Sequence, residues 1–342
     1  MISVSGFELL RGGVDGIRYA WRKDDSDQII ESAAFNNKTK NTISDICGYT
    51  TSVSIGCILS KLNSQCKFCR TGNNLHFGGF LSDKEIAKQN VFMVLSDMYC
   101  EDHQELKTKK REFAYMGQGE PGFSYRQVRS AIEITNTAMR ELGQTVYRHI
   151  FATAGVPKAI EQYTEDIQGY FTERVTLHFS LHATNDRSNI MPINNIFPYH
   201  ACIDKLNKVI EFSNEKPCIG IMLFNDYSPR GSLQPYTNSK ETVLSILKEL
   251  DPQKCRLSFC EFNPSPEVGQ SKEYAQEDAN IILQLALDNG FEAKLFSSFG
   301  KAEQTACGML GGKNPELSAT SKLYELDRIA TELIERCSIN QN

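Results

Sequence analysis

Residues 56–69 read GCILSKLNSQCKFC and contain three cysteines, Cys57, Cys66 and Cys69. Only two residues separate Cys66 from Cys69, so both thiolates can turn toward the same metal. Cys57 can join them from the far side of a loop. Structural zinc takes four protein ligands, and iron–sulfur clusters usually take four cysteines. Three thiolates therefore indicate a metal centre with one open coordination position.

Two other interpretations of this stretch remain open. His76 or Cys47 could complete an ordinary zinc site, or the three thiols could be unrelated core residues. Zinc, redox and iron–sulfur sites all use the C-x-x-C spacing, so the spacing alone does not decide among them.

The composition is typical of a globular protein, and the length of 342 residues suits one large α/β domain or two smaller ones. The net charge of −5 provides no overall basic field for nucleic acid. The sequence has no signal-peptide pattern and no apolar run of about 18 residues. We therefore predict a cytoplasmic protein without membrane contact, and expect its 11 cysteines to be free thiols.

Strand and helix patterns alternate after the cysteine stretch, which predicts βαβ units and a parallel sheet. Residues 1–35 read as strands with turns, 36–45 as a polar loop and 317–337 as a final helix. Ser82 and Glu85 form the pattern of a capped helix start. The predicted strands are 112–116, 146–152, 175–182, 219–224, 256–262 and 293–296, with helices at 128–142, 157–163, 199–213, 239–250 and 275–289. About six units suit an open or partial α/β barrel that has its functional residues at the carboxyl ends of the strands.

Polar motifs follow the cysteine stretch in a fixed order, mostly at predicted strand ends. They are MGQGEP (116–121), SLHATND (180–186), MPIN (191–194), FNP (262–264) and ACGML (306–310). With these motifs in this order, residues 13–311 resemble the radical S-adenosylmethionine (SAM) methylases of the RlmN and Cfr type.

The resemblance implies an α/β fold, a partial (βα)6 radical SAM barrel over residues 47–311. A small β extension would precede it at 1–46, and a C-terminal helical tail would follow at 312–342. The family also carries an N-terminal helical RNA-binding domain, which we expect this chain to lack because only 56 residues precede Cys57.

The resemblance also implies the cofactors, a [4Fe–4S] cluster and SAM. Cys57, Cys66 and Cys69 would ligate three irons, and SAM would bind the fourth through its amino and carboxylate groups. The residues expected to contact SAM are Gly119, Glu120, Ser180, Leu181, His182 and Asn263. An electron donor such as flavodoxin or ferredoxin would be a partner.

Three further residues have catalytic roles by resemblance. Cys307 would receive a methyl group from one SAM, and a radical formed from a second SAM would activate that methyl group for attack on an adenine carbon. Glu31 matches the family's base. Cys47 could resolve the protein–substrate adduct, although Thr50 stands where the family has its resolving cysteine.

Two more departures from the family pattern concern the cluster loop and the basic segment. The family has three residues between its first two cluster cysteines, whereas eight separate Cys57 from Cys66. The basic segment that the family has before its ACG motif is replaced by LFSSFG at 295–300.

The main prediction is an enzyme that methylates an sp2 carbon of an adenine base in RNA or a nucleotide. The alternatives are a radical SAM enzyme with non-methylating chemistry on a small molecule or nucleotide, and a zinc-containing binding protein.

Overall fold

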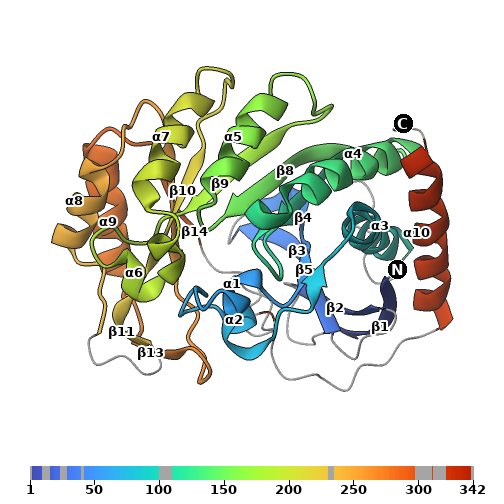
Figure 1. Ribbon diagram of the computed structural model, residues 1–342, viewed down its shortest axis with the longest axis horizontal. Coiled ribbons are helices and arrows are strands. Elements are labelled where there is room, and N and C mark those ends of the chain that lie inside the picture. Colours follow the sequence, from blue (N-terminus) through green and yellow to red (C-terminus); the bar gives the residue numbers. More distant parts are fainter. Residues whose placement is uncertain are drawn as a thin grey trace.

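A mixed sheet of ten strands runs through the described part of the computed structural model (Figure 1). The structure describes residues 2–9, 16–23, 29–39, 42–99, 110–229, 235–296, 310 and 321–339. In sheet order the strands are β1 (Ile2–Leu9), β2 (Gly16–Lys23), β3 (Ile29–Thr39), β4 (Thr42–Thr50), β7 (Lys110–Tyr115), β8 (Val146–Thr153), β9 (Val175–Ser180), β10 (Cys218–Leu223), β12 (Arg256–Glu261) and β14 (Ala293–Phe296).

The sheet has an antiparallel and a parallel half. Strands β1 to β4 pair antiparallel, and β4 then pairs parallel with β7, with Thr50 opposite Ala114. Every later neighbour is parallel. Parallel neighbours need crossover connections, which helices supply here. The fold is thus an α/β partial barrel with N-terminal strands and a C-terminal helix, as predicted, and β4 crosses the expected boundary at residue 46.

The principal helices cover the outer face of the sheet (Figure 1). They are α3 (Asp83–Tyr99), α4 (Tyr125–Glu141), α5 (Pro157–Asp166), α7 (Tyr199–Val209), α8 (Lys240–Lys248) and α9 (Gln276–Asp288). In α4, Val128, Ile132 and Met139 recur at helical spacing and are buried. The predicted capping box is present at the start of α3, where the Ser82 and Glu85 N–H groups each donate to the other's side chain.

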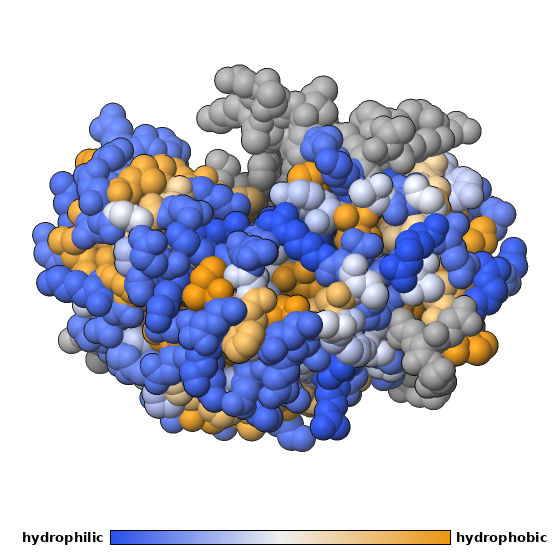
Figure 2. Space-filling view, turned by 90° about the horizontal axis from the view of Figure 1, so that it is seen from above, coloured by the Kyte–Doolittle hydropathy of each residue, from blue (hydrophilic) through white to orange (hydrophobic). Residues whose placement is uncertain are grey.

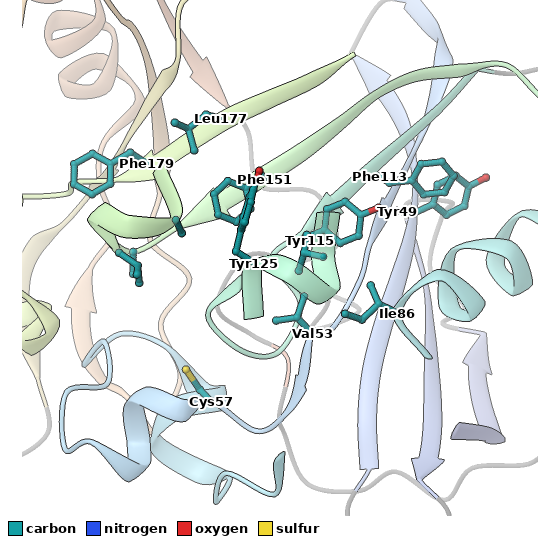
Figure 3. Packing of buried hydrophobic residues seen from close by; sticks show 14 of the residues in the cluster. Tyr49, Val53, Cys57, Ile86, Phe113, Tyr115, Tyr125, Phe151, Leu177 and Phe179 are labelled. Carbon is teal, nitrogen blue, oxygen red and sulfur yellow. The ribbon is translucent and has the colours of Figure 1, made fainter. Parts of the chain in front are cut away.

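Aromatic side chains fill the space between the sheet and these helices. Tyr49, Phe113, Tyr115 and Phe151 are buried, and they project from three neighbouring strands (Figure 3). The rings of Tyr49 and Phe113 stack at 5.2 Å. The face of the molecule shown in Figure 2 is mainly hydrophilic, with apolar groups in small patches.

The opposite side of the sheet, here called the inner face, is polar and only partly covered. Its side chains include Glu112, Arg148, His178, Ser180 and Ser258, which are half-buried. The strand registers place Glu112 beside Arg148 and Ser180 beside Gly220, which in turn lies beside Ser258. Parallel sheets are normally buried on both faces. A half-exposed polar face is therefore available for a ligand.

One predicted loop differs from the structure. The polar segment 36–45 was expected to be a loop, but β3 extends to Thr39 and β4 begins at Thr42. The antiparallel ladder explains this, because Lys38 lies opposite Ile43 and its backbone pairs whatever the side chain. The final helix is α10 (Ser321–Ile339).

Helix α10 packs against α3, α4 and β1 (Figure 1). Lys84 pairs with Glu335 at 2.6 Å, and the buried Lys88 pairs with Asp327 at 3.0 Å. The C-terminal helix therefore forms part of the main core. In the described ranges no helix has both the length and the apolar character needed to cross a bilayer.

Candidate active site

The cysteine loop lies at the carboxyl ends of the parallel strands and is built from two short helices. Cys57 precedes α1 (Ile58–Lys61), and its carbonyl accepts from the Ser60 N–H at 3.0 Å. Cys69 precedes α2 (Arg70–Asn74). The Asn73 side chain donates to the carbonyls of Cys66 and Cys69 at 2.9 and 2.6 Å. The backbone at all three cysteines is thus held by local hydrogen bonds.

The long gap between Cys57 and Cys66 is taken up by α1 and a tight turn. Asn63 has a positive φ of 50°, and the Ser64 N–H donates back to the Leu59 carbonyl at 2.8 Å. The chain therefore reverses directly after α1. The extra residues return Cys66 toward Cys57 instead of carrying it away.

The three thiols interact electrostatically. Burial raises the pKa of Cys57 and of Cys66 well above the usual range, and the neighbouring thiols raise both further. Cys69 acts on both of the others. Over the described residues, no three His, Cys, Asp or Glu side chains are already arranged to hold a metal ion. The thiols thus share one region without forming a preset ligand group.

Two contacts dock this loop on the strand ends. Phe68, which lies between Cys66 and Cys69, packs edge-on against His182 at 5.1 Å and against Phe224 at 5.5 Å. The Lys67 N–H donates to the carbonyl of Ile190 at 2.8 Å. Two motifs that are far apart in the sequence are therefore brought together, the cysteine loop and the SLHATND segment.

The turn after β7 holds a buried carboxylate. Gly119 has a φ of +104°, and a Cβ there would overlap the side chain of Ser54, so this close approach requires glycine. Glu120 accepts from Thr153 Oγ1 at 2.6 Å and from the N–H groups of Ala154 at 2.7 Å and Gly122 at 2.8 Å. Burial raises the pKa of Glu120, and these hydrogen bonds oppose that rise.

His182 lies just beyond β9 in a strained backbone conformation with a φ of 59°. Its Nδ1 accepts from the Met222 N–H at 2.9 Å. Burial lowers the pKa of His182 to about 3, with Arg187 adding to the effect. The ring is therefore neutral at pH 7, with its proton on Nε2, which can donate to a ligand.

Arg187, a residue that the motif analysis missed, lies at the centre of the site. Its fully buried guanidinium donates to carbonyls at the ends of β8 and β9, namely those of Ala154, Ser180 and Leu181. It also donates to Asn194 Oδ1 at 3.1 Å. These acceptors are all neutral, and none of the described carboxylates pairs with it. Burial lowers the pKa of Arg187 to about 10, opposed first by Cys66.

Curated proteins similar to this chain in sequence are RNA methyltransferases by name. The chain is 28% identical over 279 residues to the probable dual-specificity RNA methyltransferase RlmN of Petrotoga mobilis, covering 79% of this chain and 72% of that protein. It is 27% identical over 265 residues to the dual-specificity RNA methyltransferase RlmN of Syntrophus aciditrophicus, covering 77% and 67%. No protein-family model matches the chain.

A solved structure agrees with the fold. The crystal structure of a radical SAM methyltransferase from Sphaerobacter thermophilus has a TM-score of 0.71 and 21% identity, covering 90% of this chain and 80% of that one. The chain is thus similar in sequence to RlmN proteins, and in fold to a radical SAM methyltransferase.

Glu31 and Cys47, the two other residues expected to have catalytic roles, lie in different surroundings. Glu31 is buried on β3, pairs with Arg18 at 3.5 Å, and accepts at its carbonyl from Ser52 Oγ beside the Gly117–Gly119 turn. Cys47 is opposite Arg111, near the amino end of β7. It shares the helix-covered face with Tyr49 and is only 1% exposed. This placement argues against Cys47 as the resolving thiol, because Thr50 occupies the strand end.

The other predicted residues are less fully defined. Asn263 is buried just beyond β12, at the same edge of the sheet. Cys307 lies outside the described residues. Leu310, three positions later, is buried, and its carbonyl accepts from Thr71 Oγ1 at 2.8 Å. The chain after the ACG motif thus contacts α2 of the cysteine loop.

Proposed function

We propose that this chain is a radical SAM methyltransferase that methylates an sp2 carbon of an adenine base in RNA or a nucleotide. The observation that carries the proposal is the docking of a three-thiol loop on strand ends that hold Glu120, His182 and Arg187. The names of the RlmN relatives support an RNA substrate. The half-exposed inner face offers polar side chains to such a ligand.

The residues fit a [4Fe–4S] cluster. Without a positive centre, burial and mutual repulsion keep the Cys57 and Cys66 thiols protonated. Iron would stabilise them as thiolates, and Cys69 would complete a set of three sulfur ligands that leaves one iron open. When bound, the cluster would supply the electron that cleaves SAM, received from a donor such as flavodoxin or ferredoxin.

The polar groups of the site match the charged parts of SAM. Three hydrogen bonds hold the Glu120 carboxylate in one orientation, so it can accept from the SAM ammonium. His182 Nε2–H would donate to SAM from the β9 end. Arg187 offers a buried positive charge that the described chain does not neutralise, suited to the SAM carboxylate or to the thiolates.

Cys307 would carry the methyl group. A bond would form between Cys307 Sγ and the methyl carbon of SAM as the S–CH3 bond breaks, with release of S-adenosylhomocysteine and the thiol proton. The contact of Leu310 with Thr71 supports this role, since Leu310 is only three positions after Cys307. Glu31 would act as the base that removes the substrate proton.

Anaerobic reconstitution with iron and sulfide tests the cofactor. We expect a brown protein with about four irons per chain, and loss of the iron and colour in Cys66→Ala. Cys255→Ala is the matched control, because Cys255 is a buried thiol at the amino end of β12 and should leave the iron content unchanged. Bound zinc in place of iron would refute the proposal and support a zinc-containing binding protein.

Mass spectrometry of the Cys307 peptide after turnover with SAM tests the methyl carrier. A mass increase of one methyl group is expected in wild type and not in Cys307→Ala. An unmodified Cys307 in an iron-loaded enzyme that cleaves SAM would instead indicate radical chemistry without methyl transfer.

A further inference from the structure

Gln118, in the turn between β7 and Glu120, carries an amide that no described residue satisfies. The residue is 0% exposed, and among the described residues neither Oε1 nor Nε2 of its carboxamide has a hydrogen-bond partner. A buried amide that forms no hydrogen bonds destabilises the folded state. Unsatisfied polar groups at a functional site often mark the position of a ligand.

The backbone holds Gln118 in this position. Its N–H donates to Ser52 Oγ at 2.8 Å, and its carbonyl accepts from the Val53 N–H at 2.9 Å. On each side is a glycine, Gly117 and Gly119, packed too closely against residues 51–54 to carry a side chain. Figure 3 shows Val53 between Tyr115 and the loop that carries Cys57. Because these contacts leave the turn little freedom, the Gln118 backbone is held two residues before Glu120 of the site.

The chemistry of a carboxamide limits which group of a ligand Gln118 can bind. The charged groups of SAM already have charged counterparts in Glu120 and Arg187. A neutral amide presents one acceptor next to one donor, which matches the 6-amino group and adjacent ring nitrogen of adenine. Both SAM and the proposed substrate contain adenine, so this reasoning rests on the proposed function.

We propose that the Gln118 carboxamide binds the hydrogen-bonding edge of an adenine, with Oε1 accepting from the 6-amino group and Nε2 donating to a ring nitrogen. A good bidentate contact of this kind discriminates between bases by about 10- to 100-fold. Gln118 is thus a specificity-determining residue of the same site.

Calorimetric titration of the reconstituted full chain tests the proposal. The probes are adenosine and purine riboside, which lacks the 6-amino group. Wild type should bind adenosine at least about tenfold more tightly, and Gln118→Met, of similar volume, should bind both nucleosides alike. Equal binding by wild type, or unchanged discrimination in the variant, would overturn the proposal.

Repeating the titrations with saturating SAM shows whether Gln118 contacts the adenine of SAM or the adenine of the substrate. If wild type still binds adenosine more tightly than purine riboside in the presence of SAM, Gln118 contacts the adenine of the substrate. If adenosine no longer binds, and Gln118→Met binds SAM more weakly, Gln118 contacts the adenine of SAM. Unchanged Tm or a higher Tm in ligand-free Gln118→Met is expected, since an unpaired amide is removed. A lower Tm would show that the amide is satisfied structurally and would refute the proposal.

These titrations need no turnover. A wild-type protein that discriminates between the nucleosides but leaves Cys307 unmethylated would refute the proposed methyl transfer and not the role of Gln118.

Discussion

Arg187 shows how one buried residue holds several strand ends together. Lysine at this position would keep the charge, but its single ammonium cannot reach the acceptors that the planar guanidinium joins. We expect Arg187→Lys to lower the free energy of unfolding by about 3 kcal/mol. Urea unfolding measures this, with Arg140→Lys on the exposed side of α4 as control. Equal stability of wild type and Arg187→Lys would mean that the guanidinium bonds do not hold the strand ends.

Buried histidines should make stability fall in mild acid. Burial lowers the pKa of His149 and of His182 to about 3, and that of His178 well below its usual value. Unfolding exposes rings of ordinary pKa, near 6.5, that take up protons which the folded state excludes. Each ring should therefore remove about 1 kcal/mol of stability between pH 7 and 5.5.

Urea unfolding at pH 7, 6 and 5.5 measures this loss. His149→Gln, which removes a ring bonded to Tyr115 and Asn136, should show a shallower pH dependence by about 1 kcal/mol over this range. His200→Gln is the control, because that ring is exposed. If the free energy of unfolding falls with pH as steeply in His149→Gln as in wild type, the buried ring is not the cause.

At the scale of elements, the cysteine loop depends on a short helix and one side chain. Asn73 in α2 donates to three carbonyls of the loop, those of Cys66, Lys67 and Cys69. Asn73→Ala should leave the fold intact but free the backbone at two of the proposed iron ligands. We expect iron loss to a chelator to be several-fold faster, since each hydrogen bond contributes about 1 kcal/mol.

The control for this experiment is Lys61→Ala, an exposed position at the end of α1. It should leave the rate of iron release unchanged. If Asn73→Ala releases iron at the wild-type rate, the loop is held by the Phe68 and Lys67 contacts alone.

At the scale of the whole molecule, α10 packs against α3, α4 and β1. Leu333 is 3% exposed, so Leu333→Asp would bury a charge in the interface that joins the C-terminus to the sheet. We expect a loss of at least about 3 kcal/mol in the free energy of unfolding. Tyr324→Asp on the same helix is the control, because Tyr324 is 56% exposed and should change stability by less than about 0.5 kcal/mol. Similar losses in both variants would show that α10 is not part of the cooperative core.

The sequence by itself determined the α/β class, because apolar strands alternated with amphipathic helices. It also determined the order of the polar motifs along the chain, and the structure places SLHATND and FNP at the ends of β9 and β12. Local patterns sufficed for these features, since both strand period and helix caps depend on nearby residues. Segment 36–45 was misread for the same reason, because its strands are stabilised by pairing with residues elsewhere in the chain.

Only the tertiary structure decided which side chains meet. The alternation of strand residues places Glu31 and Cys47 on opposite faces, which their spacing in the sequence did not reveal. Arg187 and Gln118 gained importance only when burial and hydrogen bonding were known. The long gap between Cys57 and Cys66, which departed most from the family pattern, proved to be a helical turn that brings the two cysteines back together. Contacts of this kind depend on how distant segments pack, and the local sequence does not contain that information.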